Sequence, residues 1–272
     1  MRCIVKRTKI ISLILASVLL VGVLIVSLTV GIKTPEEVVQ RAEKVLTKKP
    51  YVIEMEVEYT ASSIDISGIF EELGTNETTV FFKDGNFRAH NSMSIDYGEG
   101  DNEYNSVYTA IDGTLYVNHK YTFANIKRDI KSKAEITAEQ SEELLLELLI
   151  VGAPKIEDFS EVELTKVDGD RVIVCRGASE DKYVALEEAL ISQLEGTSDS
   201  VKLTSVEMTV ELDGKKYDTV TVSCLYEVVI SGERYVVGMT VTLDYDYDEY
   251  VEIRVPDDAI EYDDVDIENL LG

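Results

Sequence analysis

The chain has 272 residues, of which 52 are acidic and 26 are basic, so its formal net charge is −26 at pH 7. Binding to nucleic acid or to anionic lipid headgroups requires a basic surface, and the composition argues against both. Apolar residues make up 45% of the chain, which is typical of a folded domain and not of a disordered one.

The first 33 residues have the composition of an export segment. Residues 1–9 form a basic tail, and Ile10–Ile32 follow without a single charge. About 20 apolar residues in a helix span a bilayer core, and the positive-inside bias places a basic tail in the cytoplasm. We therefore expect a transmembrane signal-anchor helix at residues 10–32 of a single-pass cell-membrane protein whose main domain is extracytoplasmic. A cleaved secretory signal is the alternative, because Ser27 and Thr29 are small residues near the end of the segment.

Three helices are predicted by their capping residues and apolar stripes. Thr34 caps the first, Pro35 occupies its first position, and Pro50 stops it. Thr137 opens a second capping box, and the helix behind it has a rich apolar face made of Leu144, Leu145, Leu148 and Leu149. The third helix is expected at about residues 179–194.

The rest of the chain alternates apolar and polar residues with the period of two that is typical of antiparallel strands. In Tyr51 to Tyr59, every second residue is apolar, and Glu54, Glu56 and Glu58 lie on the other face. Asp-Gly and Ser-Gly pairs separate such runs and predict tight hairpin turns at Asp84-Gly85, Asp112-Gly113, Asp168-Gly169, Asp213-Gly214 and Ser231-Gly232. The fold class expected is α+β, with one large curved antiparallel sheet covered by about three helices.

Four features, in chain order, resemble the LolA-like lipoprotein-carrier superfamily, which includes mycobacterial lipid-binding lipoproteins. They are the helix TPEEVVQRAEKVL, the strand YVIEMEVEYT, a meander of paired strands and the ending YDYDEYVEIRVPDDA. The resemblance covers residues 34–259 and leaves residues 260–272 as an acidic, partly disordered tail. It implies an incomplete β-barrel wrapped on helices, with an apolar cavity that accepts acyl chains. Many relatives carry a lipid-modified cysteine that this chain lacks, which argues against a freely shuttling carrier.

The cavity implied by the resemblance would be lined by inner strand residues and by the leucine-rich helix. The candidate lining residues are Ile53, Met55, Val57, Leu145, Leu148, Leu149, Tyr226 and Met239. Ordinary core packing is the alternative for each of them, because leucine and methionine suit a core equally well.

No motif predicts catalysis, a cofactor or a metal site. The sequence contains no HExxH, CxxC or Gly-x-Ser-x-Gly pattern and no phosphate-binding glycine loop. His90 and His119 lie in predicted strands and are expected at the surface. The run Asp244–Asp248 lacks the glycine and glutamate of a calcium-binding loop, and we expect its aspartates on a solvated strand face. Whether Cys175 and Cys224 form a disulfide is left open.

The function expected from these features is that of a membrane-anchored extracytoplasmic binding protein, with no enzymatic activity. It would hold a lipid or another apolar ligand between the sheet and the helices. The alternative is a ligand-free protein-interaction or envelope-sensing domain on the same scaffold, with a membrane or envelope protein as its partner.

Overall fold

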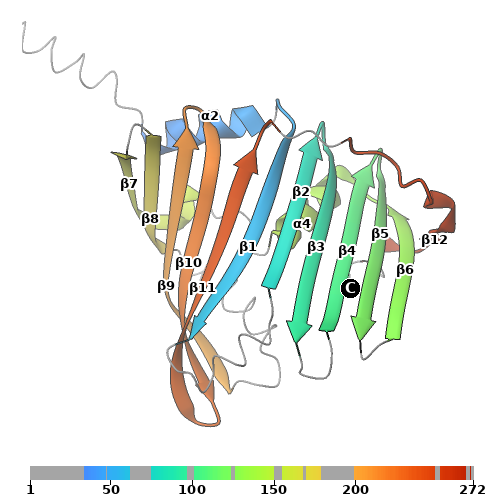
Figure 1. Ribbon diagram of the computed structural model, residues 1–272. Helices are drawn as coiled ribbons and strands as arrows, with labels where there is room; N and C mark the ends of the chain where they lie inside the picture. The colour runs from blue at the N-terminus through green and yellow to red at the C-terminus, as the bar shows by residue number, and fades with distance from the viewer. Residues whose placement is uncertain are drawn as a thin grey trace, which may run out of the picture.

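The computed structural model describes residues 34–46, 48–61, 75–96, 101–123, 126–149, 155–167, 170–178, 199–248, 252–267 and 270. These residues form two α-helices and one twelve-stranded sheet (Figure 1). The helices are α2 (Pro35–Leu46) and α4 (Ala138–Leu148), with short 3-10 turns η1 (Ile156–Asp158) and η2 (Ala259–Glu261). The strands are β1 (Tyr51–Ala61), β2 (Thr75–Lys83), β3 (Asn86–Asp96), β4 (Asp101–Ile111), β5 (Thr114–Phe123), β6 (Ile126–Glu135), β7 (Phe159–Val167), β8 (Asp170–Ala178), β9 (Ser200–Asp213), β10 (Lys216–Ile230), β11 (Glu233–Asp246) and β12 (Asp263–Asp264).

The sheet consists of two antiparallel meanders that meet at one pair of strands. Its order is β12-β6-β5-β4-β3-β2-β1-β11-β10-β9-β8-β7, so consecutive strands are neighbours within β1–β6 and within β7–β11. The meanders join where β1 pairs antiparallel with β11, which comes nearly 200 residues later in the chain. Because β1 and β11 meet at the centre, the two halves form one continuous surface, visible in Figure 1 as a single curved layer.

The expected hairpin turns are present wherever the described residues include them. Three pairs have both residues in the left-handed region, with φ values of 51° and 80° at Asp84-Gly85, 50° and 77° at Asp112-Gly113, and 53° and 81° at Ser231-Gly232. This geometry matches the twist of the flanking strands. The β9–β10 turn is shifted by one residue, because Asp213 pairs with Lys216 and leaves Gly214 and Lys215 as the loop. Asp168-Gly169 lies outside the described residues.

Both helix starts form as their capping residues predict. The Glu37 N–H donates to Thr34 Oγ1 at 3.3 Å at the start of α2. At α4 the capping box is reciprocal, because the Gln140 N–H donates to Thr137 Oγ1 at 3.2 Å and the Thr137 N–H donates to Gln140 Oε1 at 3.0 Å. Val38 on α2 and Leu144 on α4 are both buried in the same hydrophobic core as the strands. Each helix therefore contributes its apolar side to one core.

The core lies against one face of the sheet, called the inner face below and defined by Ile53, Met55 and Val57 of β1. These side chains are buried, while Glu54, Glu56 and Glu58, which alternate with them, are exposed on the outer face. The same alternation continues along β9, β10 and β11, as the sequence predicts. In the view of Figure 1, α2 crosses the end of the sheet at β7 to β11, and α4 lies behind its middle.

The described part of the acidic C-terminal segment packs on the edge of the sheet at β6. Tyr262 is 8% exposed, and its ring meets the edge of Tyr116 with centroids 5.6 Å apart. Strand β12 pairs in parallel with β6, and the Val265 N–H donates to the Lys133 carbonyl at 3.0 Å. The segment thus covers part of the β6 edge, which would otherwise expose unpaired backbone groups.

Two expectations about helices are corrected. The described residues contain two α-helices, not three, and the third, at residues 179–194, falls outside them. In the part of the chain that the structure describes, no helix is long and apolar enough to cross a membrane. The predicted transmembrane helix at residues 10–32 lies outside that part, and the membrane location inferred from it is not carried forward.

Candidate functional site

The eight candidate lining residues all contribute to, or pack against, one hydrophobic core. Six of them are buried: Ile53, Met55, Val57, Leu149, Tyr226 and Met239. Leu145 and Leu148 are partly buried and pack against the same core. The structure therefore brings these residues together, and their role as ligand contacts stays a prediction.

A transverse row of side chains crosses the inner face at Met55. Residues directly opposite each other in antiparallel strands point to the same face, so the register identifies the members of the row. On the β11 side of Met55 the row continues through Leu243, Val220, Val210 and Ile173. On the β2 side it continues through Thr78, Asn91, Ser106 and His119. One half of the row is wholly apolar and the other half is wholly polar.

The apolar half of the row is sealed from solvent. Its four aliphatic residues are at most 6% exposed, and Met55 is 2% exposed. Cys175, Met208 and Val241 are equally buried next to the row, on the same side of Met55. Burial of aliphatic side chains contributes about 25 cal/mol per Å² of apolar surface, so this half is a main source of stability.

The polar half is organised by hydrogen bonds between neighbouring strands. Asn91 Nδ2 donates to Thr78 Oγ1 at 2.9 Å, and Thr78 is 1% exposed. Ser106 Oγ and His119 Nδ1 are 2.7 Å apart, with the direction of donation set by the histidine tautomer. Tyr108 presents its ring at 83° to the His119 ring, with centroids 5.7 Å apart. Buried polar groups are costly without partners, and here they are paired.

Burial sets the charge state of this polar half. It lowers the pKa of His119 below its ordinary value of 6.5, because desolvation disfavours the imidazolium form. Burial also raises the pKa of Tyr108, opposed by a hydrogen bond with Ser106. At neutral pH the polar half therefore presents neutral donors and acceptors. His119 Nε2 has no hydrogen-bond partner within the described part of the chain, and it remains able to bind one.

A serine–histidine pair also occurs in nucleophilic catalysis, where a third group orients the imidazole. Among the residues described, no carboxylate hydrogen-bonds to His119, and the pair lies in the middle of two strands. The pair is placed to hydrogen-bond with a polar group at the inner face.

This polar row was not predicted from the sequence. Both histidines were expected at the surface, which is confirmed for His90 and wrong for His119, a half-buried residue of the inner face. Part of the signal was present, because the two-residue turns at Asp84-Gly85 and Asp112-Gly113 fix β2 on β3 and β4 on β5 residue by residue. Counting outward from these turns pairs Thr78 with Asn91 and Ser106 with His119, whereas the register of β3 with β4, which joins the two pairs into one row, follows from neither turn.

The acidic run at the end of β11 behaves as expected. Asp244, Asp246 and Asp248 are exposed, and Asp244 Oδ1 accepts a hydrogen bond from Thr219 Oγ1 at 2.8 Å. Tyr245, between them, packs on Tyr217 with ring centroids 5.3 Å apart. In the described ranges, no three metal-ligating side chains converge.

Comparison with known proteins identified no relative of this chain by sequence. No family model matches the chain, and no curated protein matches it in sequence. The resemblance to the LolA-like superfamily therefore stays a prediction.

Proposed function

We propose that this protein binds a lipid or a similar amphiphile against the inner face of its sheet. The observation that carries the proposal is the divided row through Met55, apolar toward β8 and polar toward β5. An amphiphile has the same division within one molecule. The apolar chain of the ligand would pack on the apolar half of the row, and the polar end of the ligand would hydrogen-bond with Ser106 and His119.

The apolar half supports binding of a flexible chain. Each buried methylene of a ligand contributes about 0.8 kcal/mol, so an acyl chain of ordinary length supplies several kcal/mol. Three methionines, Met55, Met208 and Met239, lie on this part of the inner face. Methionine is unbranched and adapts its shape to irregular partners, which suits a ligand of variable length.

The polar half supports recognition of an uncharged or singly charged polar end. Neutral His119 has Nε2 available, and the Ser106 hydroxyl has more hydrogen-bonding capacity than its bond to His119 uses. A purely structural core would be expected to fill these positions with apolar residues, because paired polar groups contribute little net stability. Retaining four polar residues in one row favours a binding role.

A fluorescence titration with 11-(dansylamino)undecanoic acid tests the proposal. We expect saturable binding by the full chain, with a blue-shifted emission. His119→Phe keeps a ring of similar size and removes the hydrogen-bonding nitrogens, and should weaken binding about tenfold, the value of one hydrogen bond. His90→Phe, on the outer face, is the matched control and should bind as the unaltered protein does.

The contradicting result is the absence of saturable binding by the unaltered protein under conditions where it is folded. That outcome would favour the alternative function, a ligand-free interaction domain on the same sheet.

A further inference from the structure

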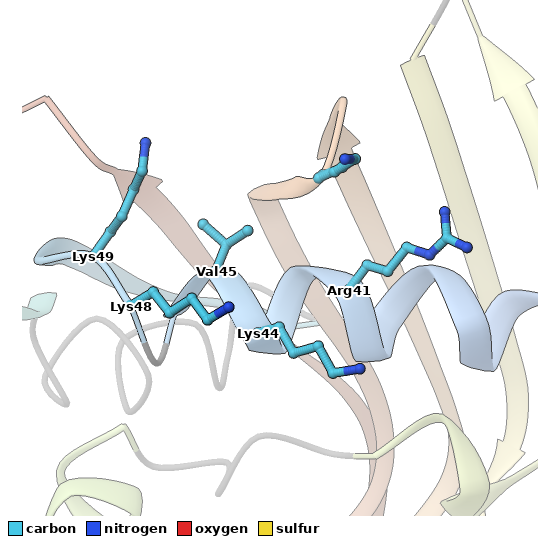
Figure 2. A pocket seen from close by; sticks show the side chains of 6 residues that line it. Arg41, Lys44, Val45, Lys48 and Lys49 are labelled. Atoms are coloured by element: carbon cyan, nitrogen blue, oxygen red, sulfur yellow. The ribbon is translucent and has the colours of Figure 1, made fainter.

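Cations gather at one pocket of this otherwise acidic protein. The pocket lies beside the C-terminal half of α2 and has a volume of about 400 Å³. Figure 2 shows the side chains that line it, which are Arg41, Lys44, Val45, Lys48, Lys49 and Lys215. The lining residues therefore include five cations and no acid, although the whole chain has twice as many acids as bases.

Two separate parts of the chain build the pocket. The period of α2 places Arg41, Lys44 and Val45 on neighbouring turns of one side of the helix, and Lys48 and Lys49 follow in the turn beyond its end. The backbone N–H groups of Lys48 and Lys49 both donate to the Val45 carbonyl, at 3.0 Å and 3.1 Å, and hold the chain in a turn.

Lys215 comes from the β9–β10 turn, more than 160 residues later in the chain. Basic residues at a helix C-terminus are common because they favour the helix dipole. That effect accounts for the lysines that follow α2, but it does not explain why Lys215 joins them from another element.

Most of these charges lack an acidic partner. Within the described part of the chain, no carboxylate oxygen lies within 4.0 Å of the charged nitrogens of Arg41, Lys48, Lys49 or Lys215. Elsewhere on the surface, cations do pair: examples are Lys131, Lys133, Arg176, Arg234 and Arg254. All five cations are exposed, and the stems of their side chains line the pocket while their charged ends reach into solvent, where they can turn toward a bound anion.

We propose that this pocket binds an organic phosphate. A phosphate monoester carries a charge of about −1.5 to −2 and three acceptor oxygens, so it compensates more of these cations and accepts more hydrogen bonds than a singly charged group does. The walls of the pocket are mainly aliphatic, formed by Val45 and by the methylene stems of the lysines. They favour a phosphate attached to an apolar or aromatic group over inorganic phosphate. The site is separate from the inner face, so its test does not depend on the function proposed above.

A second surface pocket provides a matched control. It has a similar volume, about 390 Å³, and also contains three cations, Lys120, Lys127 and Arg128. Glu103 and Asp129 line the same pocket, and Lys120 lies 3.9 Å from Asp129. Because its charges are mixed, it should not bind phosphate.

Isothermal titration calorimetry of the full chain with phenyl phosphate tests the proposal. We expect one saturable site, weakened by added salt, with binding of inorganic phosphate and of benzoate at least about tenfold weaker. The double variant Lys48→Gln, Lys215→Gln should lose at least about tenfold in affinity, since each lysine supplies a charge-assisted hydrogen bond. The double variant Lys127→Gln, Arg128→Gln should bind as the unaltered chain does. Circular dichroism and melting temperature check that both variants fold.

Flotation with vesicles identifies the source of the phosphate. Binding to vesicles containing phosphatidate, and not to pure phosphatidylcholine vesicles, would support a lipid phosphate; phenyl phosphate binding without vesicle binding would support a soluble one. The proposal is overturned if neither phenyl phosphate nor phosphatidate binds. It is also overturned if inorganic phosphate or benzoate binds as tightly as phenyl phosphate, or if the Lys48, Lys215 variant binds with unchanged affinity.

Discussion

Ser106 and His119 face each other across β4 and β5, with Ser106 Oγ 2.7 Å from His119 Nδ1 on the inner face of the sheet. This contact lies in the polar half of a row whose other half is wholly aliphatic. It joins two neighbouring strands through their side chains, in addition to the backbone hydrogen bonds of the sheet.

Removing the hydroxyl of Ser106 should destabilise the protein. Ser106→Ala leaves His119 Nδ1 without its partner in a half-buried position, which costs about 1–3 kcal/mol of unfolding free energy. Urea denaturation followed by circular dichroism measures this change in the free energy of unfolding. Ser205→Ala changes an exposed serine of β9 and should shift the free energy by less than about 0.5 kcal/mol. Equal effects of the two substitutions would contradict the assigned role of the contact.

His119 should make stability fall as the pH is lowered below about 6.5. Burial lowers the pKa of His119 in the folded protein, so the unfolded chain binds more protons between the ordinary pKa and the lowered one. The contribution is complete above the unfolded pKa and is lost as the pH falls toward the folded one. Melting temperatures from pH 7.5 to pH 5.5 should decline more steeply for the unaltered protein than for His119→Gln. If the melting temperatures of the unaltered protein and of His119→Gln fall in parallel, the imidazole of His119 is not desolvated. His90→Gln serves as the control.

Cys175 and Cys224 should both be unreactive thiols in the native protein. Both cysteines are buried, on β8 and β10 with β9 between them. Strands two apart lie about 10 Å from each other, beyond the distance of about 7 Å that a disulfide can bridge. Burial also raises the pKa of Cys175 to about 11, which suppresses the reactive thiolate.

A thiol reagent such as Ellman's reagent checks this prediction at pH 8. Little reaction is expected without denaturant, and all three cysteines of the chain should react in urea without a reductant. A single reactive thiol in urea would instead reveal a disulfide between Cys175 and Cys224.

Tyr262→Ala should release the C-terminal segment from β6. The substitution removes a largely buried ring and its edge contact with Tyr116. The contacts that remain are the partly exposed salt bridges of Lys131 with Asp258 and Glu261 and the two-residue pairing of β12 with β6, and we expect them to be too weak to hold the segment. Hydrogen exchange should then increase at β6 and β12, and the uncovered strand edge should promote self-association at high concentration. Unchanged exchange at β6 in the variant would mean that the segment docks by other contacts.

Local patterns predicted most of the strands and both described helices. Alternation in β1 and the capping residues Thr34 and Thr137 depend on neighbours within a few positions, and such signals can be read from one sequence. The pairing of β1 with β11 is different, because the two strands are distant in the chain and each would fit several partners. The expected sheet was therefore right in type, whereas its strand order depends on long-range pairing that local patterns do not predict.

The features that bear on function were harder to predict because they depend on residues brought together by several strands. Thr78, Asn91, Ser106 and His119 are each ordinary strand residues, and only the combined register of β2 to β5 makes them a row. Net charge likewise argued against anionic ligands, since an average over the chain cannot show that Lys215 lies beside the lysines at the end of α2. The C-terminal segment is acidic, which is typical of disorder, yet the basic strand β6 supplies charges to hold it.

Native mass spectrometry of the gently purified full chain is the most direct test of amphiphile binding by the inner face. We expect a population heavier than the bare chain by the mass of one amphiphile, restored to the bare mass by organic extraction and regained on incubation with a fatty acid. A chain that shows only its bare mass, both as purified and after incubation with saturating fatty acids or lysophospholipids, would contradict the proposal that the inner face binds an amphiphile.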